Sequence, residues 1–590
     1  MKTTPLSKLR SDGYALITVL AIVAVSLIIV AASVRRTSGT ANLNERNNMY
    51  VECQNAAEAA TEKVVARMAY DFHANGVATV QNNLDSIYRA SVPNEDARWS
   101  AFTFSDGQTA NRTSVQKVQD YAGAMPSQFP GLNTLSGPIY RIKSTVTKTE
   151  GVNTVTATVQ EDMLLALIPL PQWAIFANNL LEFSTCATLD VRGRVHANNN
   201  IYVGAGAGAS SSSTLTFYDQ VTATGTVSAP DNAGSSWGTD WNTTFSTPYS
   251  TNRPTVSLNF NMTNAHSLIE FPATGVTATS DAGRQLLYYN AQIVLVVTNT
   301  GVSIKIQAPP NTASVPGADT TPIILTTNLA GATNFPFLTV TNTFTDQREA
   351  GKTVITTQID IAKYANWLRT NTTITTKFSG IYPTILYAAD NRTTNVTTVM
   401  PAIRLVNGTN LPYNGGAGFS VATPNPLYVW GNYNCTNSSY MGTTNTSATV
   451  PAALISDAMT ILSTSWLDSK SALGYSSRTA ASATTVNACV LTGMVPSTGT
   501  TSATFGGGIH NFPRLLEDWG TSTLWFNTSM LYLYTSKAAT NKFIYPGLSG
   551  AYYSPPSRKF SYDQNFNRLD KQPPGIPTAL VAVRINWAPR

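Results

Sequence analysis

The sequence predicts a mainly β protein that begins with one long α-helix. Residues 14–32 form an uncharged apolar run, and apolar side chains then recur every three or four positions as far as Met68. After Pro169, short runs of apolar and β-branched residues end repeatedly in Asn, Gly and Ser clusters. We therefore expect a helix, then an α+β segment, and then a right-handed parallel β-solenoid, with a β-sandwich as the alternative for the distal part.

Length and composition set the limits of this expectation. A chain of 590 residues exceeds the ~250–300 residues that one core usually supports, so two or three domains are expected. Charged residues make up 12% of the chain and hydrophobic residues 43%, which excludes a disordered polyampholyte. The net charge of +6 is spread thinly, without a block of like charges, so nucleic acid is not an expected partner.

The apolar run is long enough to cross a membrane. Residues 14–34 are predicted to be a transmembrane helix, because the uncharged run alone spans roughly 28 Å of hydrocarbon as a helix. Lys2, Lys8 and Arg10 precede it, so the positive-inside rule keeps residues 1–13 in the cytoplasm and exports the rest of the chain. A cleaved secretory signal and an ordinary signal anchor are the alternatives.

A glycine stands at the junction between the polar leader and the apolar helix, in the sequence SDGYAL at residues 11–16. A peptidase must approach the backbone closely there, and glycine places no side chain in its way. This junction resembles the leader of type IV prepilins and of the pseudopilins of type II secretion. The resemblance implies that a prepilin peptidase cuts after Gly13 and that Tyr14 becomes the N-methylated first residue.

The helix is predicted to continue beyond the membrane through residues 35–75. Its apolar side chains form one stripe for helix packing, made of Met49, Cys53, Ala56, Ala60, Val64 and Met68. Charged residues occupy the other faces. The segments NERNN at 44–48 and QNAAEAA at 54–60 resemble the first helix of PilX-type minor pilins, and the likeness covers residues 10–75.

The fifth position of the mature chain departs from the common pilin pattern. Most pilins carry a glutamate there, which pairs with the terminal amine of a neighbouring subunit, whereas this chain has Thr18. A carboxylate buried in lipid is unfavourable unless paired, so its absence removes both a penalty and a contact to the subunit above. PilX-like minor pilins and GspK-like pseudopilins share this lack, and the resemblance implies a place at the fibre tip.

The exported body is predicted to contain several β-rich regions. Residues 76–170 are assigned to a pilin-like α+β region, in which alternating residues on both sides of Glu150-Gly151 predict a hairpin. Residues 171–230 are predicted to form the first solenoid coils and residues 231–345 a β-rich insertion. Residues 346–590 are predicted to form the main coils and a tail that ends in a strand.

Few residues indicate chemistry, so we expect no enzyme. Glu517 and Asp518 are adjacent and would point to opposite faces of a strand, which separates the two carboxylates that glycoside hydrolysis needs. A tethered polysaccharide-active enzyme, with convergence of Asp360, Asp390 and Asp457, is the weaker alternative. The sequence contains no HExxH, C-x-x-C or EF-hand pattern, and we expect neither a metal nor a cofactor.

Two groups of side chains in the body are candidates for contacts or cross-links. Strand alternation in DVRGRVHA places Arg192, Arg194 and His196 on an outward face, which is either a solvated strand face or a contact for an acidic surface or partner subunit. Export permits disulfides, and Cys435 and Cys489 could pair between coils, although four cysteines allow three connectivities. For Cys489, a small buried apolar residue is the alternative.

These features and the resemblance predict a minor pilin or pseudopilin of a type IV pilus or type II secretion-like fibre. Before assembly it would sit in the inner membrane through residues 14–34 with a periplasmic body, and afterwards at the pilus tip or cell surface. Its implied partners are other minor and major pilins or pseudopilins, the prepilin peptidase, the inner-membrane assembly platform and membrane lipid. An inner-membrane-anchored surface adhesin or binding module is the alternative function.

Overall fold

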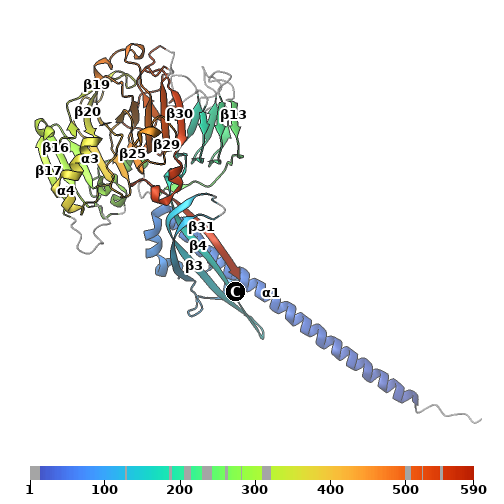
Figure 1. Ribbon diagram of the computed structural model, residues 1–590. Coiled ribbons are helices and arrows are strands. Elements are labelled where there is room, and N and C mark those ends of the chain that lie inside the picture. The colour runs from blue at the N-terminus through green and yellow to red at the C-terminus, as the bar shows by residue number, and fades with distance from the viewer. Residues whose placement is uncertain are drawn as a thin grey trace, which may run out of the picture.

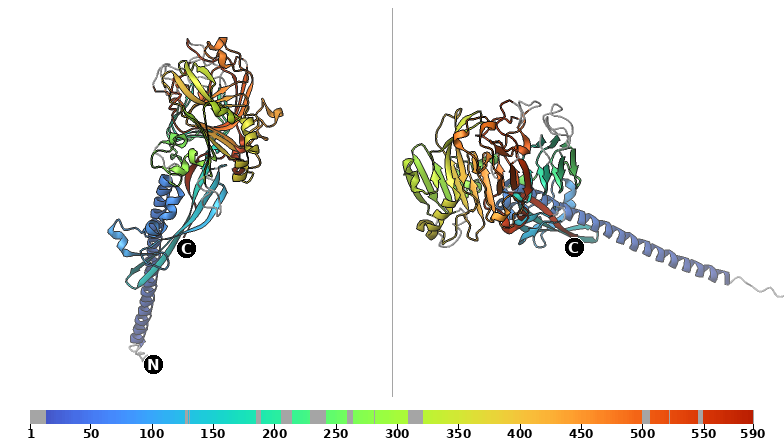
Figure 2. Two further views of the ribbon diagram at one scale, coloured as in Figure 1. Left: turned by 90° about the vertical axis from the view of Figure 1, so that its left-hand side faces the viewer. Right: turned by 45° about the horizontal axis from the view of Figure 1, so that its top comes forward.

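One long helix and an antiparallel sheet form a stalk that carries a larger β-rich head (Figure 1). The computed structural model describes residues 14–126, 129, 131–184, 189–204, 214–228, 242–258, 264–280, 282–308, 321–498, 506–520, 522–544 and 549–589. The helix projects away from the head, and the C-terminus lies on the stalk (Figure 2). The expectation of a mainly β protein with one long N-terminal helix is therefore confirmed.

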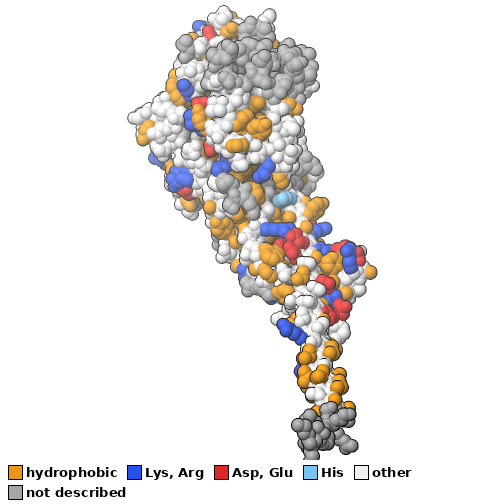
Figure 3. Space-filling view, turned by 90° about the vertical axis from the view of Figure 1, so that its right-hand side faces the viewer, with side chains coloured by type: hydrophobic (Ala, Val, Ile, Leu, Met, Phe, Trp, Pro, Cys, Tyr) orange, Lys and Arg blue, Asp and Glu red, His pale blue; other side chains and the backbone are white. Residues whose placement is uncertain are grey.

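The helix, α1 (Tyr14–Asn82), has an exposed half and a packed half. Every residue from 14 to 48 is exposed, and buried positions begin at Met49. Figure 3 shows the apolar side chains of the exposed half on the surface. Gly76 adopts φ 76° and ψ −171°, a left-handed backbone that suits glycine, and it places a kink near the end of the helix.

The stalk sheet joins strands from three distant parts of the chain. Its order is β1-β3-β4-β31-β14, every neighbouring pair is antiparallel, and β2 also pairs with β3. The hairpin predicted around Glu150-Gly151 is present, with Glu150 opposite Asn153. The bounds are β1 Phe102–Ser105, β2 Ser114–Ala124, β3 Asn133–Glu150, β4 Asn153–Pro169, β14 Ser257–Leu258 and β31 Thr578–Pro589.

The packed half of α1 covers one face of this sheet. Small side chains such as Ala57 and Ala60 lie against Val146 and Val159, which lets the helix approach the strands closely. Nearer the head, larger residues take over, and Phe72 lies in a cluster with Leu165 of β4 and Leu580 of β31. Removing this apolar surface from water stabilises the stalk by roughly 25 cal/mol per Å² buried.

The first part of the head consists of short parallel strands in three sheets. Successive strands visit the sheets in turn, so that β5-β8-β11, β6-β9-β12 and β7-β10-β13 lie side by side. The rings of Phe183, Phe217 and Phe245 follow one another along the stack with 5.1 Å between centroids. The bounds are β5 Ile175–Ala177, β6 Leu181–Ser184, β7 Leu189–Val191, β8 Val195–Ala197, β9 Ile201–Gly204, β10 Thr214–Phe217, β11 Val221–Ala223, β12 Val227–Ser228 and β13 Asn242–Phe245.

The second part of the head alternates between two larger sheets. Odd-numbered strands from β21 to β29 join a twelve-stranded sheet, and even-numbered strands from β20 to β28 join a seven-stranded sheet. Neighbours within both series are parallel. The bounds are β20 Lys352–Asp360, β21 Ile385–Asp390, β22 Val399–Val406, β23 Phe419–Ala422, β24 Leu427–Trp430, β25 Ala452–Ser456, β26 Met459–Leu462, β27 Thr484–Thr492, β28 Pro513–Leu515 and β29 Thr523–Tyr532.

The two parts of the head meet in the middle of the twelve-stranded sheet. Met530 of β29, near the end of the chain, lies opposite Ile175 of β5. The chain therefore enters the head at its centre, builds outward to β13, crosses to the other end at β15, and returns to the centre at β29 (Figure 1). It then passes through β30 (Ser557–Tyr562), which pairs with β29, and re-enters the stalk as β31.

Antiparallel strands extend both large sheets, so the sheets are mixed and open. β15 is parallel to β21 but antiparallel to β16, which in turn pairs with β17, while β18 and β19 are antiparallel to β20. Residues 231–345, predicted to be an insertion, contribute strands to the first stack, the stalk and both large sheets. The bounds are β15 Ile293–Val297, β16 Gly301–Ile306, β17 Ile323–Asn328, β18 Leu338–Thr339, β19 Thr343–Asp346, α2 Leu287–Asn290, α3 Ile361–Thr370 and α4 Thr372–Lys377.

Candidate functional site

The exposed apolar segment of α1 is the principal candidate site. By length and composition, α1 contains a window that can cross a membrane, and none of that window is buried within the protein. Leu20, Ile22 and Ile28 are 65%, 64% and 68% exposed. So much apolar surface on one rod needs lipid or other apolar helices around it.

Thr18 is held by the backbone of its own helix. Its Oγ1 donates to the Tyr14 carbonyl, and the Ala15 carbonyl lies 3.2 Å away. A hydroxyl bonded in this way can enter an apolar environment without leaving a polar group unpaired. Position 18 therefore carries no charge. Gly13 lies outside the described residues, and Tyr14 is the first residue of α1.

The predicted apolar stripe of the helix faces the stalk sheet. All six of its members are buried: Met49, Cys53, Ala56, Ala60, Val64 and Met68. The Cys53 thiol lies 3.5 Å from the Val155 carbonyl, and burial raises the pKa of that thiol. The stripe thus fixes the helix to its own stalk and leaves residues 14–48 available for contacts with other molecules.

An ion-pair network fastens the C-terminal strand to the helix. Arg584 of β31 pairs with both carboxylate oxygens of Glu62 on α1, and its guanidinium lies 3.7 Å from Glu161 of β4. Glu161 is 1% exposed and accepts a hydrogen bond from Thr61, and burial raises its pKa. Sequence reasoning missed this network, because Glu62 and Arg584 are 522 residues apart and no local pattern connects them.

A buried carboxylate holds the segments on both sides of the Gly76 kink. Asp71 is 3% exposed and accepts hydrogen bonds from the Tyr88 hydroxyl at 2.8 Å, Arg67 Nε at 3.1 Å and Asn83 Nδ2 at 3.3 Å. Burial and the bond to Asp71 raise the pKa of Tyr88. The end of the helix is therefore held in one orientation beneath the head.

The predicted outward face of Arg192, Arg194 and His196 needs correction. Arg192 is exposed and lies 3.7 Å over the Tyr218 ring, and Arg194 is half-buried, but His196 is only 3% exposed. Gly193, with φ 111°, makes a turn between β7 and β8, so the three residues do not share one strand. The His196 ring nitrogens lie 2.8 Å from Thr222 Oγ1 and 2.9 Å from Asn198 Oδ1.

The buried imidazole should make stability depend on pH. Burial lowers the pKa of His196 to about 4, whereas an unfolded histidine titrates near ~6.5. As the pH falls from ~6.5 to ~4, the unfolded chain gains a proton that the folded chain does not, so stability decreases by up to about 3 kcal/mol. The variant His196→Gln should lose this slope when urea unfolding is measured across that range. An unchanged slope would contradict the assignment to His196.

The possible disulfide between Cys435 and Cys489 is not formed, and both cysteines are free and buried. The Cys435 thiol is directed at the Tyr433 and Thr485 carbonyls, at 3.4 and 3.6 Å, while Cys489 stands opposite Ser529 on the neighbouring strand. Burial raises the pKa of Cys435 to about 12 and also raises that of Cys489. The alternative of a small buried core residue describes Cys489. Cys186 lies outside the described residues.

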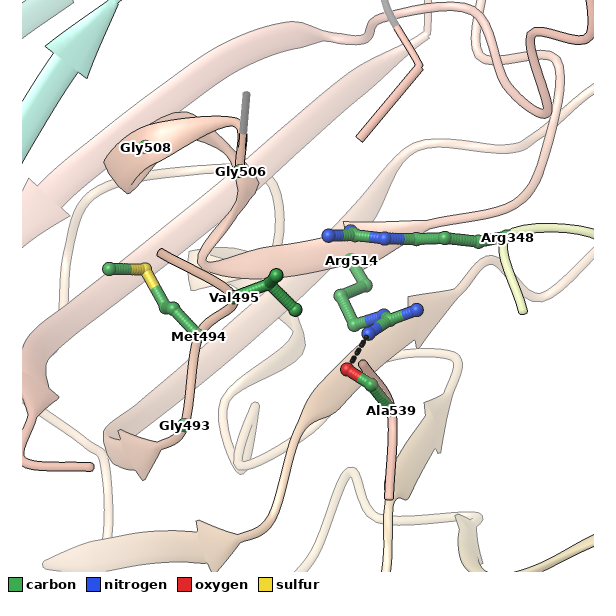
Figure 4. A pocket seen from close by; sticks show the side chains of 8 residues that line it. All are labelled: Arg348, Gly493, Met494, Val495, Gly506, Gly508, Arg514 and Ala539. Carbon is green, nitrogen blue, oxygen red and sulfur yellow. Dashed lines mark hydrogen bonds between the residues drawn. The ribbon is translucent and has the colours of Figure 1, made fainter. Parts of the chain in front are cut away.

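A small polar cavity in the head is lined by two arginines (Figure 4). Arg514 donates to the Ala539 carbonyl at 2.9 Å and pairs with Glu349, and burial together with Arg514 lowers the pKa of Arg348. The cavity, of about 10 Å³, is the size of one water molecule, so it is not a substrate site. Within the described part of the chain, no group of three or more His, Cys, Asp or Glu is placed to hold a metal ion.

The described chain thus combines three parts: a helix that is apolar and long enough to cross a membrane, a stalk sheet and a large β-rich head. No family model and no curated protein matches the chain. A similar solved structure is that of the competence-associated pilin ComZ from Thermus thermophilus, with 12% identity over 92% of this chain and 97% of that chain. Its TM-score of 0.27 is too low to establish a common fold.

Proposed function

We propose that the protein is a minor pilin or pseudopilin, which assembles through the exposed half of α1 and displays its head from the fibre. The observation that carries this proposal is the length of the exposed half, residues 14–48. A plain anchor needs only about 20 apolar residues. Residues 35–48 add roughly 21 Å of exposed, more polar helix between the membrane and the body, which gives neighbouring helices room to pack.

The same proposal covers how the protein reaches the fibre and where in the fibre it lies. The chain starts in the inner membrane with a periplasmic body, is cut by the prepilin peptidase, and enters a fibre through the assembly platform. Two features support a tip position: Thr18 carries no charge for a subunit above it, and the head is wider than the stalk in both views of Figure 2. A head of this width would be difficult to repeat along a shaft.

We also propose that the parallel strands of the head are coils of a β-solenoid. Strands that visit three sheets in turn, and then two sheets in turn, support coiling rather than a β-sandwich. Asn178 and Asn198, at equivalent places on successive turns, share a hydrogen bond of 2.9 Å. We expect the coils to be right-handed, because connections between parallel strands of one sheet are almost always right-handed.

A non-catalytic head belongs to the proposal as well. Each carboxylate that could have served an enzyme has a structural partner. Asp360 caps α3 at Lys363 N, Asp390 pairs with Arg392, and Asp457 lies 2.9 Å from His266 Nε2. Glu517 accepts from Ser463, and Asp518 accepts from Ser554 Oγ. Such partners supply the hydrogen bonds that a general acid or base would otherwise direct at a substrate.

The processing site tests the proposed function. The mature protein should begin at N-methylated Tyr14 when its intact mass is measured. Gly13→Leu should retain the leader and disappear from sheared fibres, whereas Ser11→Leu, a matched change in the same leader, should be processed normally. Crosslinks from Ile28→Cys to other pilins would distinguish assembly from a solitary anchored adhesin. A mature chain that begins elsewhere would contradict the proposal.

A further inference from the structure

A cleft of about 620 Å³ lies where the head meets the stalk. On the face shown in Figure 3, a histidine and basic side chains lie at this junction, with acidic side chains beside them on the stalk. The cleft is bounded by α1 at His73, by Trp173, by β8, by residues 253–256 and by β31. Its volume is in the usual range for a ligand site, about 300–1,000 Å³.

The wall formed by β31 is the edge of a strand. Residues 580–584 all line the cleft, although successive side chains of a strand point to opposite faces. Five consecutive residues can border one cleft only through the strand's edge. One side of β31 pairs with β4 throughout, while β14 on the other side reaches only Leu580 and Ala579. Among the described residues, no strand pairs with that side of β31 from Val581 onward.

The pairing of β14 with β31 stops at Ser257, because the residue before it is bonded elsewhere. If β14 extended one residue further back, Val256 would stand opposite Val581. Instead, the Val256 N–H donates to Asn198 Oδ1 at 2.8 Å, and its carbonyl accepts from Asn198 Nδ2 at 2.9 Å. Pro254, two residues earlier, has no N–H to donate to a ladder. The segment before β14 therefore turns toward the head, and the cleft remains open beside β31.

The walls of the cleft combine apolar surface with positive charge. Leu132 and Trp173 supply apolar side chains, and Arg194 and the exposed Arg253 stand at the cleft. Arg584 also lines it, but Glu62 balances its charge. None of the described residues that line the cleft is Asp or Glu. The cleft therefore favours an occupant with apolar side chains and a carboxylate.

We propose that the cleft binds an extended, acidic peptide segment of a neighbouring protein, which adds as a strand to the free edge of β31. Backbone bonds to β31 would supply affinity, and Arg253 would select the carboxylate. A bilayer lipid does not fit, because the 39 residues of helix from 34 to 73 place the cleft roughly 58 Å above the membrane. This inference stands whether or not the chain is a pilin.

A labelled synthetic peptide provides the test. The full chain in detergent is titrated with acetyl-Thr-Val-Ser-Val-Thr-Val-Asp, and binding is followed by fluorescence polarisation. The same peptide N-methylated at every backbone nitrogen has no N–H left to donate to an edge strand, and it should bind at least about tenfold more weakly. Arg253→Glu should also weaken binding of the first peptide about tenfold, because it replaces an attraction by a repulsion. Arg369→Glu, a matched change at an exposed arginine of α3, should not.

The outcomes separate the alternatives. Equal binding of the N-methylated peptide would overturn strand addition and indicate a small-molecule cleft. No binding of either peptide would overturn the proposal. Self-association of the full chain that Arg253→Glu abolishes would show a second copy as the occupant and would overturn the assignment to another protein.

Discussion

A chain that lacks residues 578–590 is expected to lose the folded stalk. β31 pairs with β4 from Thr578 opposite Pro169 to Pro589 opposite Val159, and Leu580 and Val583 are each only 2% exposed. Burial of each such side chain is worth about 1.5–3 kcal/mol. Without Arg584, the buried Glu161 also loses its nearest positive charge, which adds further cost. The sum exceeds ~5 kcal/mol, comparable to the whole stability of many domains.

Limited proteolysis and hydrogen exchange should locate this loss. The truncated protein should be cleaved within β3 and β4, whose backbone amides should exchange rapidly, while β25 and β27 in the head stay protected. A shorter truncation of residues 587–590 is the control, because it keeps Leu580, Val583 and Arg584. It should change the free energy of unfolding by less than about 1 kcal/mol. Equal effects of both truncations would contradict the role of the central part of β31.

The parts of the fold that could be predicted from the sequence are those fixed by neighbouring residues. Spacings of three and four gave the buried stripe of α1, and alternation around Glu150-Gly151 gave the β3–β4 hairpin. The return of β31 to β4, and the meeting of β5 with β29, could not be predicted. These pairings join segments hundreds of residues apart, and each strand alone carries only the general signature of a half-buried strand.

Among the candidate sites, too, those built from local patterns could be predicted, and those built from long-range contacts could not. The apolar run and the leader glycine are local patterns, whereas the network of Arg584, Glu62 and Glu161 depends on tertiary contacts. Strict alternation puts His196 on the outer face only if one strand runs through Gly193, and Gly193 breaks that strand. A glycine inside a short strand pattern is a signal for a turn or bulge, and Gly193 is such a signal in this sequence.

Arg404 is a charged residue inside an apolar strand of the head, and the sequence did not indicate its role. It lies on β22 and is fully buried. Its Nη1 and Nη2 donate to the two carboxylate oxygens of Asp468 at 2.7 and 2.9 Å, and its Nε donates to Gln358 at 2.9 Å. The guanidinium also lies 4.9 Å from the Trp430 ring. Such a planar, two-pronged bond to a carboxylate is particular to arginine.

Arg404→Ala is therefore expected to destabilise the head by about 3–5 kcal/mol, since it leaves a cavity and removes the partner of Asp468. Arg404→Met should cost less, because it fills most of the volume and Asp468 is 27% exposed and can regain water. Arg404→Lys should fall between them, as it keeps the charge but loses the paired bonds. Urea unfolding of the full chain measures these differences, with the exposed Arg369→Ala as the neutral control. If Arg404→Ala and Arg369→Ala unfold at the same urea concentration, the buried ion pair does not hold β22 to the turn at Asp468.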